Sequence, residues 1–174
     1  MHHLKLLLPL SLLALTAACR RPDPLRLQPT IEEPPALASL IRMADPATAT
    51  QLLRGFYPVE QNAWRWSAPK FSVVLGAPPS ASRKGAGLVL KFSLVDPEIA
   101  SLKRLTLSAI AGNAALAPET YIESGAHEYR RDVPANAFSD ANINVNFALD
   151  KFFKTESDDR QLGLIVTSVA LEAQ

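Results

Sequence analysis

The sequence predicts an all-β protein, an antiparallel two-sheet β-sandwich of the jelly-roll type, and three observations lead to this fold class. Short segments in which apolar and polar residues alternate follow one another from about residue 63 to the C-terminus. Proline, glycine, asparagine and aspartate separate these segments at short intervals. No stretch after Gly55 has the apolar spacing of a long amphipathic helix. Alternation indicates strands with one buried face and one wet face, which is typical of antiparallel sheets.

The first eighteen residues predict an export signal. A short, weakly basic start is followed by an apolar run at residues 6–15. Ten residues rising about 1.5 Å each span about 15 Å as a helix, which is half of a hydrocarbon core about 30 Å thick. The run is therefore too short to cross a membrane and suits the core of a signal peptide. Ala17 and Ala18 supply small residues for cleavage, so residues 1–18 are predicted to be the signal peptide.

Cys19, the single cysteine of the chain, directly follows this cleavage point. Residues 16–19 resemble the lipobox of bacterial lipoproteins, although Thr16 stands where leucine is usual. The resemblance implies lipidation of Cys19 and a membrane-anchored lipoprotein that faces the periplasm or the cell surface. Ordinary cleavage after Ala18 is the alternative, and it would leave a free thiol in an oxidising compartment. Arg20 is not the aspartate that retains some lipoproteins at the inner membrane, which favours the outer membrane.

A proline-rich tether is predicted to follow, over residues 19–45. Six of the fourteen prolines lie between residues 20 and 46, and each one lacks an N–H and restricts the residue before it. The tether is therefore expected to be extended, with one short helix at residues 36–43. Asp45 and Pro46 are a good helix start and Gly55 a good stop, so a short helix is predicted at 46–54. The β-sandwich domain is accordingly predicted over residues 46–174.

The strands are predicted where apolar residues recur at every second position. Residues 142–148 show this well, since three asparagines alternate with isoleucine, valine and phenylalanine. Gly112 and Asn113 predict a two-residue hairpin turn. The expected strands cover residues 63–67, 71–75, 88–94, 105–111, 114–116, 120–122, 128–133, 142–148 and 162–171.

Three short motifs resemble a known family of modules. Residues 55–67 contain Gly-Phe-Tyr-Pro and Trp-Arg-Trp-Ser, residues 147–150 read Phe-Ala-Leu-Asp, and residues 159–164 read Asp-Arg-Gln-Leu-Gly-Leu. Together they resemble a β-sandwich module found beside bacterial glycosyltransferases and in cell-surface polysaccharide proteins. Gln161 stands where that family usually has glutamate. The resemblance covers roughly residues 55–172 and implies a jelly-roll, carbohydrate-binding-like module without catalytic residues.

Charge and cysteine content exclude several classes of protein. Eighteen basic and seventeen acidic residues give a net charge of +1, and removal of Lys5 with the signal leaves zero. A balanced chain lacks the electrostatic field that attracts nucleic acid or an anionic membrane surface, so no nucleic-acid partner is predicted. One cysteine excludes a disulfide framework and a cysteine-built zinc site. No cofactor or metal is predicted.

Oxygen ligands for Ca²⁺ are the one metal alternative that the chain offers. Asp158 with Asp159, or Asp140 with Asn142 and Asn144, could supply them. Turn residues that solvate loop ends explain both groups better.

The chemistry for catalysis is sparse. His127 is the single histidine beyond the signal, and no nucleophile motif accompanies it. A paired-carboxylate hydrolase could draw on Glu119, Glu123, Asp132 or Asp150, but their spacing does not bring two of them together. The chain is therefore predicted not to be an enzyme.

Four residues are candidates for binding a glycan, namely Tyr57, Trp64, Trp66 and Arg160. Trp64 and Trp66 are two positions apart, so they share one face of a strand, with Arg65 on the other. An exposed pair could stack on a sugar ring, whereas a buried pair would be core, and we expect at least one to be buried. Arg160 could bind a sugar, but an arginine at this place more often pairs with a carboxylate such as Asp150.

Three functions follow from these observations. The first is a non-catalytic envelope lipoprotein whose sandwich binds a glycan or cell-surface polysaccharide. The second is a structural or assembly lipoprotein that binds an envelope protein through a sheet edge or the proline-rich arm. The third, the least favoured, is an envelope glycoside hydrolase.

Overall fold

The computed structural model describes residues 36–174. The predicted signal peptide, Cys19 and the tether up to residue 35 lie outside the described residues, so their assignments stay predictions. Within residues 36–174, no helix is both long and apolar enough to cross a membrane.

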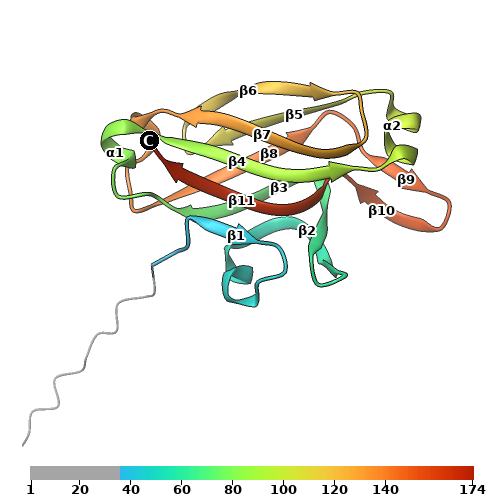
Figure 1. Cartoon of the computed structure of the whole chain (residues 1–174), viewed down its shortest axis with the longest axis horizontal. Coiled ribbons are helices and arrows are strands. Elements are labelled where there is room, and N and C mark those ends of the chain that lie inside the picture. The colour runs from blue at the N-terminus through green and yellow to red at the C-terminus, as the bar shows by residue number, and fades with distance from the viewer. Residues whose placement is uncertain (1–35) are drawn as a thin grey trace, which may run out of the picture. The chain divides into compact units, whose positions relative to one another are not determined.

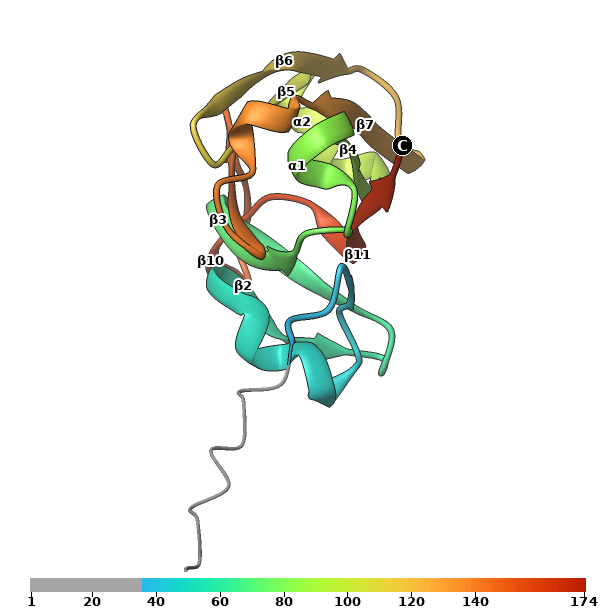
Figure 2. The ribbon, with the colours of Figure 1, turned by 90° about the vertical axis from the view of Figure 1, so that its left-hand side faces the viewer.

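Nine strands form two packed antiparallel layers (Figure 1). Figure 2, which looks along the strands, shows β3 on one side of the sandwich and β4, β7 and β11 on the other. The chain passes from one layer to the other between β1 and β2, β3 and β4, β4 and β5, β6 and β7, β7 and β8, and β8 and β11. These repeated crossings make the sandwich a jelly-roll type and confirm the predicted fold class. The first layer contains, in spatial order, β6 (Ala114–Tyr121), β5 (Leu105–Ala111), β8 (Asn142–Leu149), β3 (Trp64–Gly76) and β2 (Leu52–Glu60), and the second contains β7 (Gly125–Val133), β4 (Ala86–Leu94), β11 (Ile165–Ala173) and β1 (Leu40–Arg42).

Strand β3 connects the two layers. Its residues 70–76 pair with β8, whereas Arg65 and Trp66 pair with Val166 and Ile165 of β11. The hairpin before it, β2–β3, turns through Gln61 and Asn62, whose φ angles are 50° and 51°. One strand therefore belongs to the first layer at its end and to the second layer near its start.

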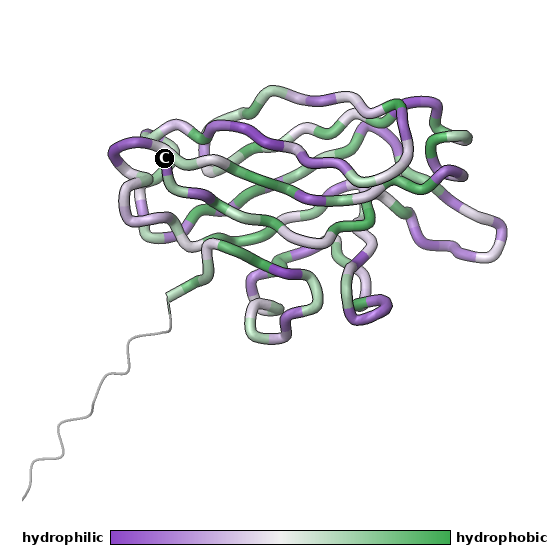
Figure 3. Tube along the Cα trace, viewed as in Figure 1, coloured by the Kyte–Doolittle hydropathy of each residue, from purple (hydrophilic) through white to green (hydrophobic). Residues whose placement is uncertain are grey.

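The core lies between the layers and follows from the alternation of side chains. On β8 the odd-numbered residues are buried and the asparagines face outward, and β5 has the same two-residue repeat. Figure 3 shows hydrophobic and hydrophilic residues interleaved along the chain. Phe71 stacks on Phe147 at 4.8 Å between ring centroids, and Phe56 meets Phe71 edge-on at 5.4 Å. The largest fully buried side chains are Tyr129, Phe71, Phe92, Phe147, Ile41, Met43, Leu75, Leu88, Leu90, Leu94, Leu105 and Leu107.

Short elements close the two ends of the sandwich (Figure 1). Helix α2 (Asp96–Leu102) and the hairpin of β9 (Phe153–Thr155) and β10 (Asp158–Leu162) lie at one end. Helix α1 (Ala81–Lys84) packs on a 3-10 helix (Ala135–Ala137) at the other.

The ordered sandwich begins earlier than predicted. Residues 40–42 form strand β1, paired with β11, and not a helix within a tether. Ile41 and Met43 are fully buried in the main core, because a repeat of two rather than of three or four places both on one face. The described module therefore includes residues 36–45, ten residues ahead of the predicted boundary at residue 46.

The helix predicted at 46–54 starts as expected and ends early. Asp45 caps it by accepting the N–H of Ala47 at 2.9 Å, but the 3-10 helix ends at Gln51 and β2 begins at the next residue. Gln51 is buried and donates to the carbonyl oxygens of Ala38 and Val74, which fixes the end of the helix. Gly55 is not a helix stop. Its φ is 75° within β2, where an added Cβ would lie 2.2 Å from the carbonyl oxygen of Lys70.

Most predicted strands are present with small changes in their bounds. Residues 105–111 form β5 as predicted, and Gly112, with φ 58°, begins the two-residue turn that follows. The segments 114–116 and 120–122 merge into β6, and 162–171 divides between β10 and β11. Strand β2 was expected as helix and loop, and β9 was not expected as a strand.

Candidate functional site

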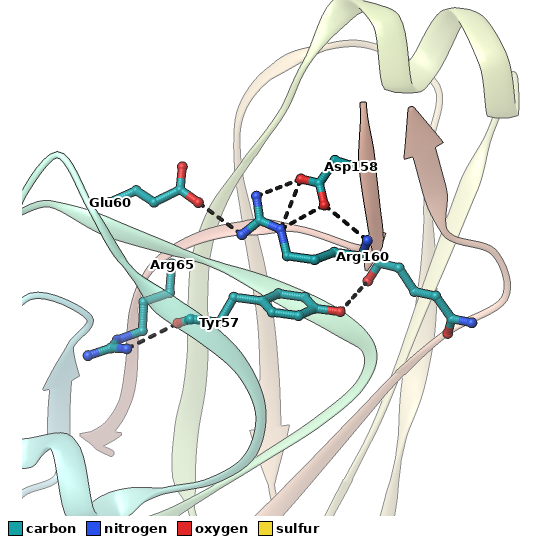
Figure 4. A network of polar contacts seen from close by, with 6 residues as sticks. Tyr57, Glu60, Arg65, Asp158 and Arg160 are labelled. Carbon is teal, nitrogen blue, oxygen red and sulfur yellow. Dashed lines mark hydrogen bonds and ion pairs between the residues drawn. The ribbon is translucent and has the colours of Figure 1, made fainter. Parts of the chain in front are cut away.

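Two segments distant in the sequence, the β2–β3 hairpin and β10, bring the predicted binding residues to one region. Tyr57 of β2 lies under Arg160 of β10, whose guanidinium carbon is 5.1 Å from the centre of the tyrosine ring (Figure 4). The Tyr57 hydroxyl donates to the carbonyl oxygen of Gln161 at 3.3 Å. The tyrosine is thereby held between β2 and the β9–β10 hairpin.

Two carboxylates flank the guanidinium of Arg160. Its Nε donates to Asp158 Oδ2 at 2.9 Å and Nη2 reaches the same oxygen at 2.7 Å, while Nη1 donates to Glu60 Oε1 at 3.0 Å. All three side chains are partly exposed, at 33%, 25% and 35% for Arg160, Asp158 and Glu60. Hydrogen bonds from Arg160 lower the pKa of Asp158, and the bonds to Asp158 and Glu60 raise the pKa of Arg160. We call Tyr57, Glu60, Asp158 and Arg160 the Arg160 cluster.

Asp150 was the expected partner of Arg160, and that expectation is wrong. Asp150 instead accepts the backbone N–H of Thr106 at 2.7 Å and holds the start of β5. Glu60 was not predicted to be a partner of Arg160, because the two residues are 100 positions apart in the sequence.

The two tryptophans share one face beside the Arg160 cluster. Their rings meet edge-on, with centroids 6.0 Å apart and planes at 88°. Trp66 is buried, with 8% of its surface exposed, whereas Trp64 is half-buried. The expectation that at least one would be buried is confirmed. Trp64 is paired directly with Glu60 across the β2–β3 ladder, which places its indole beside the cluster.

Arg65 points to the opposite side of β3, as its position between the tryptophans predicts. Its Nε donates to the carbonyl oxygen of Met43 at 3.0 Å, and its Nη1 donates to that of Tyr57 at 3.0 Å (Figure 4). These bonds fix the backbone of β2 under Tyr57. Arg65 is therefore a positioning residue for the cluster, which the sequence pattern did not indicate.

The carboxylates considered for catalysis interact with different partners. Glu119 pairs with Arg131 at 2.7 Å, and Asp132 accepts from the side chain of Gln174 at 2.6 Å. His127 is half-buried on β7, with its Nε2 2.9 Å from the carbonyl oxygen of Glu123. Over residues 36–174, no group of three or more histidine, cysteine, aspartate or glutamate side chains could hold a metal ion.

Replacing Arg160 with methionine is expected to loosen the β9–β10 hairpin, because the guanidinium joins that hairpin to β2. The pairs are partly exposed, so we expect a loss of about 1 kcal/mol or less in global stability. Amide hydrogen exchange is expected to become faster at residues 153–162 specifically. The variant Arg104→Met removes an exposed arginine from the β5 end and is the control. Equal protection of the hairpin in both variants would show that the ion pairs do not hold it.

The chain matches no protein-family model and no curated protein. Among solved structures, it is similar to the CBM36-1 domain of a multidomain xylanase from the hindgut metagenome of Trinervitermes trinervoides, with 14% identity and a TM-score of 0.37 over 60% of this chain and 71% of that chain. It is also similar to a CBM4 structure, with 8% identity and a TM-score of 0.33 over 76% of this chain and 82% of that chain. At these scores the fold assignment rests on the strand pairing and topology of the chain itself.

Proposed function

We propose that this chain is a non-catalytic glycan-binding protein and that Trp64 and the Arg160 cluster form its binding site. One observation carries the proposal: the half-buried Trp64 is paired across the β2–β3 ladder with Glu60, and Glu60 and Asp158 flank the partly exposed guanidinium of Arg160. A sugar ring presents an apolar C–H face and a rim of hydroxyls. An aromatic face with a few fixed polar groups matches both parts of such a ligand.

The Arg160 cluster keeps hydrogen-bonding capacity for a ligand. Of the five guanidinium N–H groups, Nε, one on Nη1 and one on Nη2 are used within residues 36–174, which leaves two. Each carboxylate has acceptor sites beyond those taken by Arg160. Hydroxyls both donate and accept, so a sugar can bond to either kind of group. In this arrangement Trp66 supports the ring of Trp64 from below and does not touch the ligand.

The charge state of the cluster favours binding over hydrolysis. A glycosidase acid needs a carboxyl whose pKa is raised, so that it keeps its proton until the bond breaks. Arg160 lowers the pKa of Asp158 instead. Asp158 is therefore suited to accept hydrogen bonds from hydroxyls.

The proposal includes export and anchoring. The signal-like segment at residues 1–18 and the lipobox-like residues at 16–19 support lipidation of Cys19, with the sandwich in the periplasm or on the cell surface. Mass spectrometry of the protein purified from a bacterial membrane fraction tests this part. The expected product begins at Cys19 and carries acyl chains, whereas a product that retains residues 1–18 contradicts it.

Replacing Trp64 with alanine is expected to weaken glycan binding at least tenfold, which corresponds to about 1.4 kcal/mol. The assay is affinity electrophoresis of the full chain in gels that contain dextran, hydroxyethyl cellulose, arabinoxylan or alginate. Both tryptophans of the chain lie in this site, so a saturable change in tryptophan fluorescence of the unaltered protein reports occupancy of this site in particular. Phe152→Ala, which removes an exposed aromatic ring elsewhere, is the matched control.

The outcomes separate the candidate functions. Binding that is lost in a folded Trp64→Ala protein and kept in Phe152→Ala supports the proposal. If Trp64→Ala binds polysaccharide as tightly as the unaltered protein, the assignment of the binding site to Trp64 is contradicted. Absence of binding to every polysaccharide contradicts the glycan function and favours the alternative of a structural lipoprotein with a protein partner.

A further inference from the structure

A row of asparagines lies on the outer face of the first layer, away from the Arg160 cluster. Asn142, Asn144 and Asn146 alternate along β8 with buried residues and span about 13 Å of the strand. The three asparagines line a hollow of 780 Å³ together with Ser139 and Asp140. A second hollow of 520 Å³, between Pro78 and Phe138, shares residues 139–141 with the first. The two hollows are neighbours, because they share these residues, and we call them together the asparagine groove.

The fold itself does not call for asparagine at these positions. Asparagine is disfavoured in strands, where threonine, valine and isoleucine fit better. Residues 145–148 of β8 are paired with β5 on one side and β3 on the other, whereas Asn142 and Asn144 lie beyond the β5 ladder and are paired with β3 alone. The outward residue of β5 opposite Asn146 is Ile110, and Ser108 lies opposite Ala148. Asn142 and Asn144 therefore depart from the usual strand preference at the point where the β5 ladder has ended, and they line the hollow there, as is typical of a functional surface.

Two of the three amides are free to bind a ligand. Asn146 Oδ1 accepts from Arg54 Nη2 at 3.2 Å. The side chains of Asn142 and Asn144 are exposed and form no hydrogen bond with any residue in the range 36–174. Each amide offers two donors and one acceptor oxygen. Ile110 of β5, opposite Asn146 and 49% exposed, adds an apolar surface next to the row.

The charge around the groove favours a neutral ligand. Asp140 is the one charged residue that lines the two hollows, and it accepts a hydrogen bond from Ser139 Oγ at 3.1 Å. The guanidinium of Arg54 lies at the other end of the row, on Asn146. Neutral amides that both donate and accept match hydroxyl groups, which do the same, better than they match carboxylates or phosphates.

We infer that the asparagine groove is a second binding surface, which takes a neutral, hydroxyl-rich polysaccharide chain lying along β8. The surface is separate from the proposed tryptophan site. Asn144 is paired with Val74, ten residues along β3 from Trp64, which is roughly 30 Å for an extended strand. The inference goes beyond the proposed function and does not depend on the tryptophan site. Two such surfaces on one chain would hold a long polymer more tightly than either surface alone.

The test is a double variant, Asn142→Val with Asn144→Val, in the full chain. Valine removes the amides and favours a strand, so the variant is expected to fold, which far-UV circular dichroism and a thermal melt check. We expect at least a tenfold loss of affinity for neutral polysaccharides, namely dextran, hydroxyethyl cellulose or arabinoxylan, in affinity electrophoresis. Thr120→Val, an exposed outward residue two strands away on β6, is the matched control and is expected to bind as the unaltered protein does.

The failure of this inference differs from the failure of the proposed function. A folded double variant that binds neutral polysaccharides as tightly as the unaltered protein overturns the groove, whatever Trp64→Ala does. Retardation by alginate alone, with no neutral polysaccharide bound, overturns it too. Suppose that the double variant no longer binds neutral polysaccharides in electrophoresis, while its tryptophan fluorescence still changes when a polysaccharide is added. This result supports the groove and shows that the two sites are distinct. Loss in the double variant when Trp64→Ala has no effect supports the groove and removes the tryptophan site.

Discussion

Replacing Phe71 with alanine lowers the free energy of unfolding by about 3–5 kcal/mol, the largest loss we expect from a single substitution in this chain. The Phe71 side chain is fully buried, stacks on Phe147 and is met edge-on by Phe56. It lies where β3 has β8 on one side and β2 on the other, so the surrounding backbone has little freedom to collapse into the cavity.

Urea unfolding followed by far-UV circular dichroism measures this loss. Phe152→Ala removes the same ring from a position that is 41% exposed and is expected to change stability by less than about 0.5 kcal/mol. A loss below about 1 kcal/mol for Phe71→Ala would mean that the two layers repack around the missing ring. It would also contradict the tight contact between β3 and β8.

Replacing Glu98 with glutamine is expected to stabilise the protein at alkaline pH by roughly 2–4 kcal/mol. Glu98 is fully buried in α2, its Oε2 accepts the N–H of Val95 at 3.5 Å, and its Oε1 has no partner within residues 36–174. Burial raises the pKa of this carboxyl from the ordinary 4.5 to about 8. The folded protein therefore holds a proton that the unfolded chain releases.

The sign of the pH dependence follows from this difference in proton binding. A raised pKa contributes stability that is fully present below about pH 4.5 and is lost as the pH rises to about 8. The unaltered protein is thus expected to lose stability across this interval, and Glu98→Gln to lose much less, because its neutral amide resembles the protonated acid. Urea midpoints at pH 5 and pH 8.5 measure the effect. Glu156→Gln, in the exposed turn between β9 and β10, is the control. Parallel pH profiles for Glu98→Gln and the unaltered protein would show that Glu98 is not protonated in the fold.

The strands that could be predicted from the sequence are those with one apolar face and one polar face. On β8 the alternation of apolar residues with asparagine specifies both the conformation and the buried face, and β5 is similar. Strand β2 could not be predicted in this way, since it contains Gly55 and Pro58, both disfavoured in strands. It is a strand because it pairs with β3. Glycine is required at position 55, because the backbone of Lys70 approaches too closely for a residue with a Cβ.

The candidate site likewise has one part that the sequence predicts and another part that it does not predict. The spacing of Trp64 and Trp66 is enough to place both rings on one face, and the structure has them in contact. Which of the two rings is exposed depends on the segments that cover that face, and the residues around the tryptophans do not indicate which segments these are. The partners of Arg160 show the same limit, because Asp158 is two residues away and Glu60 is one hundred.

The sequence by itself determined the all-β class, the alternating faces of the central strands, the shared face of the two tryptophans, and the signal-like start with its single cysteine. Tertiary structure alone decided that residues 40–42 join the sandwich, that Trp66 is buried while Trp64 is not, and that Glu60 completes the Arg160 cluster. It also decided that the asparagines of β8 line a hollow on the outer face of the first layer, where the ladder between β5 and β8 ends. The physical reason is that alternation and turn chemistry act between residues a few positions apart, whereas burial and ion pairing depend on segments that only folding brings together.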